Sequence, residues 1–171
     1  MGERDYDRSL TDDGRAMASQ TGRILASLNL SIDRVITSAA ARTSETADLV
    51  ATEISSVATD ERRSQSLRVT YEPELYHASG HAFANAATQH AFDDESAVLV
   101  VGHNPGIGAL MCYWADERLD VSPATLVAFR FDVNSWKNIK ANHNKGVKVL
   151  AVIQDGMLQK VDATLQHERK G

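Results

Sequence analysis

Apolar residues in this 171-residue chain fall into two patterns that alternate along the sequence. Short continuous or alternating apolar runs predict strands at 34–38, 69–71, 98–101, 125–132, 147–154 and 157–161. Apolar residues at helical spacing predict helices at 11–29, 39–54, 83–92 and 105–114. Strands that alternate with helices predict an α/β fold.

Cap and turn residues mark several of the expected boundaries. Thr11 is a good N-cap for the first helix, and Asp12 and Asp13 place negative charge in its first turn. Asp155-Gly156 predicts a two-residue hairpin turn between the last two strands. Three polar stretches predict an exposed connection, a loop and a frayed tail: Thr59–Arg68, Ser135–Gly146 and the residues from Thr164 onward.

The stretch most suggestive of function follows the apolar run Val98–Val101, which is typical of a buried strand. Gly102 lets the backbone leave the sheet tightly, and Pro105 suits the first turn of the next helix. His103 and Asn104 therefore lie between the carboxyl end of a strand and a helix start, where α/β sheets bind ligands and helix dipoles favour anions. The alternative is that His103 is an ordinary loop or buried histidine.

A second strand end repeats this arrangement. Ser38 closes the strand Arg34–Ser38, and Arg42 is expected in or near the first turn of the following helix. An arginine there can hold a phosphate through two hydrogen bonds, assisted by free backbone N–H groups. The alternative is a surface arginine paired with Glu45 or Glu53.

Composition favours a globular protein with one domain, 1–171, and a sizeable core. A net charge of -5 argues against nucleic-acid and anionic-membrane partners, and no apolar run approaches the length of a membrane span. Without a signal-peptide pattern, the cytoplasm is the expected location, and a monomer is the expected state. The lone Cys112 excludes an internal disulfide, and the sequence shows no convincing metal spacing among its histidines, including His77, His81 and His90.

Four motifs, in this order along the chain, resemble those of the histidine phosphatase superfamily, in particular its SixA-like phosphohistidine phosphatase branch. They are the opening Asp7–Gly14; Ser38, Arg42, Thr46 and Ala47; Pro73–Tyr76; and Gly102–Pro105. Ser135-Trp136 also resembles that branch. The resemblance covers nearly the whole chain from Asp7 and implies a three-layer α/β/α sandwich with a mostly parallel central sheet.

The resemblance also implies a chemistry without metal or cofactor. In such enzymes a histidine attacks phosphorus and is transiently phosphorylated, while two arginines and a second histidine neutralise the phosphoryl charge. By motif, Arg42 is one of these arginines and His103 is the second histidine. The supporting or phosphate-binding groups are then Ser38, Asn104, Gly102 and Arg8. Glu74 is the nearest candidate for a general acid, although an ordinary loop carboxylate is the better interpretation.

One family motif is missing from this sequence. The nucleophilic histidine belongs to an Arg-His motif at the end of the family's first strand, and no Arg-His pair occurs in the chain. We therefore expect a chain truncated at its N-terminus relative to the family. In the family that first strand lies beside the Gly-His-Asn-Pro strand. Val98–Val101 is thus expected to face a gap or to be drawn against Arg34–Ser38, in a product of low stability or solubility.

The resemblance implies a phosphohistidine phosphatase-like phosphomonoesterase that acts on a phosphorylated protein. The alternative is a catalytically inactive module that binds phosphate or phosphohistidine, because the nucleophilic motif is absent. A phosphatase for a small phosphorylated metabolite is a third interpretation, although such enzymes usually carry a larger and more basic middle insertion.

Overall fold

A computed structural model describes residues 5–57, 67–141 and 144–167 of the chain. In order, the elements are the short 3₁₀ turn η1 (Asp5–Asp7), α1 (Asp12–Ser27), β1 (Arg34–Ser38), α2 (Ala41–Ser56), β2 (Arg68–Glu72), the 3₁₀ turn η2 (Pro73–Leu75), α3 (Gly80–His90), β3 (Val98–Val101), α4 (Gly106–Ala115), β4 (Leu126–Phe131), the 3₁₀ turn η3 (Trp136–Asn138), β5 (Val147–Gln154), β6 (Met157–Val161) and α5 (Ala163–His167). Every predicted helix and strand is present. Most of the expected connection at 59–68 lies outside the described residues.

The strands form two separate three-stranded sheets in the described part of the chain. The first has the order β2-β1-β3, and both of its pairings are parallel. The second has the order β4-β5-β6, and both of its pairings are antiparallel. The predicted α/β fold is confirmed. Its parallel part is the β2-β1-β3 sheet, whereas the three later strands form an antiparallel sheet of their own.

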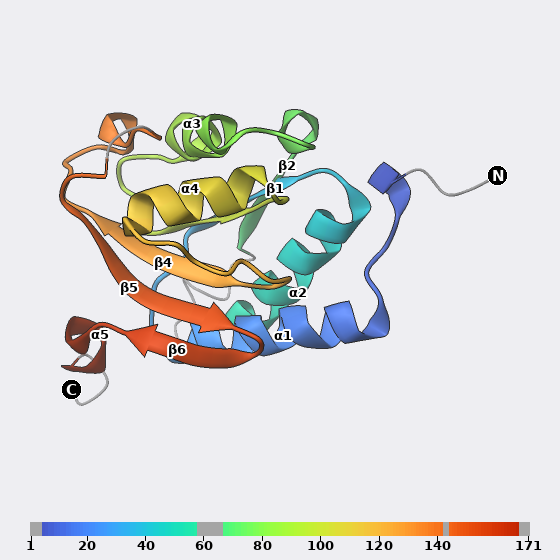
Figure 1. Cartoon of the computed structure of the whole chain (residues 1–171). Coiled ribbons are helices and arrows are strands. Elements are labelled where there is room, and N and C mark those ends of the chain that lie inside the picture. The colour runs from blue at the N-terminus through green and yellow to red at the C-terminus, as the bar shows by residue number, and fades with distance from the viewer. Residues whose placement is uncertain (1–4, 58–66, 142–143, 168–171) are drawn as a thin grey trace.

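Helices cover both faces of the strands, so the predicted three-layer arrangement is confirmed (Figure 1). On one side α1 packs against α2, and their apolar residues, such as Leu25 and Val50, join a core cluster with Leu150 and Ile153 of β5. On the other side α3 packs against α4, and Phe83 is buried in a cluster with Ile36 and Leu110. Burying such side chains is the main favourable contribution to folding.

Local signals are confirmed where side chains or turn geometry decide the boundary. The Thr11 hydroxyl accepts a hydrogen bond from the Gly14 amide at 3.1 Å and caps α1 as predicted. Asp155 and Gly156 both have positive φ and join β5 to β6. The expectation of a frayed tail from Thr164 is wrong as far as His167, because α5 begins at Ala163 and buries Leu165 in the core, where 3% of it remains exposed. The rest of that tail, 168–171, lies outside the described residues.

A gap beside β3 is the most unusual feature of the fold. In the described chain β3 pairs with β1 on one side only, and β4 pairs with β5 on one side only. The expected gap at Val98–Val101 is therefore present. The same four residues were predicted to be buried on both faces, but they are only half-buried, because no described strand covers the second edge of β3. Among the described helices, none has the length and hydropathy needed to cross a membrane.

Candidate functional site

The carboxyl ends of β1 and β3 carry the residues that the sequence singled out. Because these two strands are parallel neighbours, their carboxyl ends meet at one edge of the sheet. Ser38 closes β1, Arg42 is the second residue of α2, and His103 follows β3 by two residues. The structure thus brings Ser38, Arg42 and His103 to the same place.

Arg42 holds a carboxylate in this structure. Its two terminal nitrogens donate to the two carboxylate oxygens of Asp5 at 3.2 and 3.1 Å, and Nη1 also donates to the Asp5 carbonyl at 2.7 Å. The alternative pairing of Arg42 with Glu45 or Glu53 is wrong, because Glu45 pairs with Arg15 and Glu53 with Arg23. In this structure Arg42 therefore binds one carboxylate through both of its terminal nitrogens.

The backbone at the start of α2 adds to this anion site. Ala40, the N-cap residue, makes no capping hydrogen bond through a side chain. The first N–H groups of a helix have no partner within the helix, and the helix dipole places partial positive charge there. Arg42 and the beginning of α2 therefore present donors of the kind that bind phosphate.

His103 is held beside Arg42 by hydroxyl groups. Its Nε2 lies 3.0 Å from the Oγ of Ser38, which is fully buried, and 3.5 Å from the Oγ1 of Thr43. Burial lowers the pKa of His103 below its usual value, and the positive charge of Arg42 and the proximity of His77 lower it further. The imidazole is therefore neutral near pH 7, where it can donate or accept a hydrogen bond according to its tautomer.

Three further residues contact this site: Asp5, Tyr76 and His77. The sequence analysis did not assign any of them to it. The Tyr76 hydroxyl donates to Asp5 at 2.9 Å, and the Tyr76 ring packs edge-on against His103 with centroids 5.5 Å apart. His77 has a positive φ and lies 6.4 Å from His103, ring centre to ring centre. The hydrogen bond from Arg42, followed by that from Tyr76, lowers the pKa of Asp5, so this carboxyl is ionised near neutral pH.

The remaining predicted residues lie at or near this edge in lesser roles. Arg8 is exposed and contacts Asp5 at 3.3 Å. The Asn104 side chain donates to the Val121 carbonyl at 2.9 Å and thus fixes the neighbouring loop. Glu74 is exposed in η2. Gly102 is required sterically, because a Cβ there would lie 2.3 Å from Cε1 of the buried Phe83.

The site borders a large cavity. Arg42 and His103 line it together with residues of β3 and β4, and its volume is about 1060 Å³. In the described part of the chain, no group of three or more His, Cys, Asp or Glu side chains is arranged to hold a metal ion.

Known proteins resemble this chain in sequence and in fold. Residues 2–65 match the model of the histidine phosphatase superfamily (branch 1). The chain is 28% identical over 162 residues to the mitochondrial serine/threonine-protein phosphatase Pgam5 of Drosophila grimshawi and 28% identical over 173 residues to that of Drosophila persimilis. These alignments cover 84% and 88% of this chain, but only 51% and 58% of the relatives, so the chain spans about half of their length.

Two solved structures show the same fold. The structure of a phosphohistidine phosphatase SixA candidate from Agrobacterium tumefaciens superposes with a TM-score of 0.66 at 20% identity, covering 90% of this chain and 87% of the other. Its counterpart from Nakamurella multipartitia gives 0.66 at 24% identity, covering 90% and 88%. Over residues 2–65 the chain is thus similar to the histidine phosphatase superfamily, and its fold is that of the two SixA structures.

Proposed function

We propose that this chain acts on phosphorylated proteins as a phosphohistidine phosphatase-like phosphomonoesterase, and that the edge formed by Arg42 and His103 binds the phosphoryl group. The observation that carries the proposal is that Arg42, at the start of α2, donates hydrogen bonds to both carboxylate oxygens of Asp5. A carboxylate and a phosphoryl group share the geometry that an arginine fork recognises. The Pgam5 relatives are named protein phosphatases, which supports a phosphoprotein as the substrate.

In this proposal some residues neutralise the charge of the phosphoryl group and others form hydrogen bonds or transfer protons. Arg42 and the first N–H groups of α2 neutralise the oxygens that carry charge in the transition state. His103, neutral near pH 7 and held by Ser38, has a nitrogen available for a hydrogen bond or for proton transfer. Asp5 is displaced from Arg42 when the phosphoryl group binds, because both need the same guanidinium face.

A histidine leaving group fits this set of residues. Asp5 is ionised near neutral pH and has no proton to give to a departing alcohol. An imidazole, with an unperturbed pKa of about 6.5, can take its proton from water before it leaves. The proposal therefore places phosphohistidine ahead of phosphoserine as the substrate.

A second candidate is supported by one observation from the sequence. The 171 residues contain no Arg-His pair, the motif that supplies the nucleophile in the family that this chain resembles. A chain with the anion site but without that nucleophile would bind phosphohistidine and release little phosphate.

A single preparation of a phosphohistidine protein tests both candidates. The proposed enzyme releases inorganic phosphate over many turnovers, whereas the binding module forms a complex that survives gel filtration without release. Phosphoserine protein and inorganic phosphate serve as competitors. Absence of both binding and release with the phosphohistidine protein would refute the assignment of this edge as a phosphoryl site.

A further inference from the structure

Tyr76 and Arg42 donate hydrogen bonds to the same oxygen atom. Nη2 of Arg42 lies 3.1 Å from Oδ2 of Asp5, and the Tyr76 hydroxyl donates to that Oδ2 at 2.9 Å. The other carboxylate oxygen, Oδ1, accepts from Nη1 of Arg42 at 3.2 Å. A guanidinium from the first turn of α2 and a phenolic hydroxyl from the residue that ends η2 therefore bind one anion together.

The Tyr76 ring is held in place by its neighbours. It packs edge-on against Tyr6 with ring centres 5.0 Å apart and against His103 at 5.5 Å, and the His77 ring contacts it at 4.0 Å. The preceding residue, Leu75, is buried in the core and anchors the backbone. A donor that is already ordered loses little conformational entropy when it binds a ligand.

The Tyr76 hydroxyl is a donor at neutral pH. Desolvation by burial, followed by the hydrogen bond to Asp5, raises the pKa of Tyr76 above its usual value. The hydroxyl therefore keeps its proton and can offer it to an anion bound at Arg42. A phosphoryl oxygen, like a carboxylate oxygen, has lone pairs for two hydrogen bonds at once.

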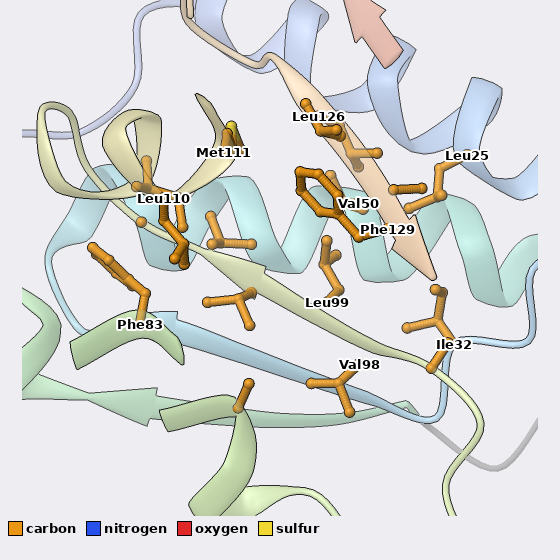
Figure 2. A pocket seen from close by; sticks show the side chains of 18 of the residues that line it. Leu25, Ile32, Val50, Phe83, Val98, Leu99, Leu110, Met111, Leu126 and Phe129 are labelled. Atoms are coloured by element: carbon orange, nitrogen blue, oxygen red, sulfur yellow. The ribbon is translucent and has the colours of Figure 1, made fainter. Parts of the chain in front are cut away.

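The part of the cavity drawn in Figure 2 offers no comparable donor. The side chains labelled there are all apolar, among them Leu99 of β3, Phe129 of β4 and Leu110 of α4. A charged phosphoryl group is unfavourable beside them, because it would lose water without gaining hydrogen bonds. It is therefore expected on the side of Arg42 where Tyr76 lies.

We propose that Tyr76 is a binding residue of the phosphoryl site, and that its hydroxyl donates to the phosphoryl oxygen that Nη2 of Arg42 also binds. This inference rests on the proposed function, because it requires that a phosphoryl group displaces Asp5 from Arg42. It adds an uncharged donor to the site and gives a role to the motif Pro73–Tyr76, which the proposed function leaves without one. A merely structural Tyr76 would hold Asp5 against Arg42 and would not contact the ligand.

The test removes the hydroxyl in the presence and in the absence of the carboxylate that competes for it. Tyr76→Phe keeps the ring and its packing but loses the donor. In the original chain this loss weakens the binding of both Asp5 and phosphate to Arg42, so the two effects partly cancel. Asp5→Ala removes the competitor, and adding Tyr76→Phe to it isolates the bond to phosphate. Tyr71→Phe in the same background is the matched control, because the Tyr71 hydroxyl donates to another carboxylate of α2, that of Asp48.

Dissociation constants for inorganic phosphate are measured by titration calorimetry at fixed pH and ionic strength. In the Asp5→Ala background, Tyr76→Phe is expected to weaken phosphate binding about fivefold, the usual effect of losing one partly exposed hydrogen bond. Tyr71→Phe is expected to leave it unchanged. An effect of Tyr76→Phe no larger than that of Tyr71→Phe would overturn the inference.

Arg42→Ala in the same background separates this inference from the proposed function. If Arg42→Ala weakens phosphate binding and Tyr76→Phe does not, Tyr76 only holds Asp5, and the phosphoryl site at Arg42 still stands. If neither substitution weakens phosphate binding, the inference and the phosphoryl site are both refuted.

Discussion

Replacing Arg42 with alanine tests the phosphoryl site most directly. The guanidinium donates to both carboxylate oxygens of Asp5, and 23% of the Arg42 side chain is exposed. A bound phosphate takes over these two charge-assisted hydrogen bonds. A hydrogen bond to a charged group contributes roughly 1.5–3 kcal/mol, and partial exposure together with displacement of Asp5 reduces the net value for the pair to about 2 kcal/mol. We therefore expect R42A to weaken phosphate binding roughly 30-fold.

Two further variants make this measurement specific. Arg42→Lys keeps the charge but not the planar fork, and is expected to recover only part of the loss. Arg23→Ala removes a different arginine, on the surface of α1, that also pairs with a carboxylate, that of Glu53. This variant is expected to bind phosphate like the original chain. Titration calorimetry with inorganic phosphate at fixed ionic strength gives the dissociation constants. If R42A and R23A bind phosphate within threefold of each other, the role of Arg42 is refuted.

Three other predictions concern stability and pH. Gly102→Ala places a Cβ against the buried Phe83 ring and is expected to destabilise the fold by about 1–3 kcal/mol, measured by urea unfolding. Glu95→Gln leaves Arg34, whose side chain is 8% exposed, without its carboxylate, and is expected to cost on the order of 3 kcal/mol in the same assay; a loss below 0.5 kcal/mol would contradict it. The pKa of His103 is below its usual value in the folded state, so the unfolded state binds more protons as the pH falls through about 6.5. Stability is therefore lost on acidification over that interval, and His103→Gln should flatten this part of the profile measured between pH 7.5 and 5.

Local sequence signals predicted the elements well because each depends on neighbouring residues. Short-range sterics or hydrogen bonding fix element boundaries at three places: the run Val98–Val101, the Thr11 cap and the Asp155-Gly156 turn. The rule that ligands bind at the carboxyl ends of parallel strands also singled out both Arg42 and His103. That rule uses only strand order and direction, which the alternation of strands and helices predicts.

Other parts of the site depend on contacts between distant residues and left no local signal. Asp5 lies in a polar stretch without periodicity, and its pairing with Arg42 joins residues 37 positions apart. His77 showed no useful spacing from another ligand, yet its left-handed backbone brings its ring near His103. Leu165 was hidden in a polar tail, where a single apolar residue is enough to anchor one helical turn to the core.

The edge of β3 that no described strand covers shows a further limit of what an apolar pattern predicts. An apolar run such as Val98–Val101 has the composition of a strand with neighbours on both sides, whether or not both neighbours are present. Among the described strands β3 has one neighbour, and its four residues are half-buried. Arg42 and His103 line the same cavity as these four residues, so the edge of β3 that the apolar run did not predict belongs to the surroundings of the candidate site.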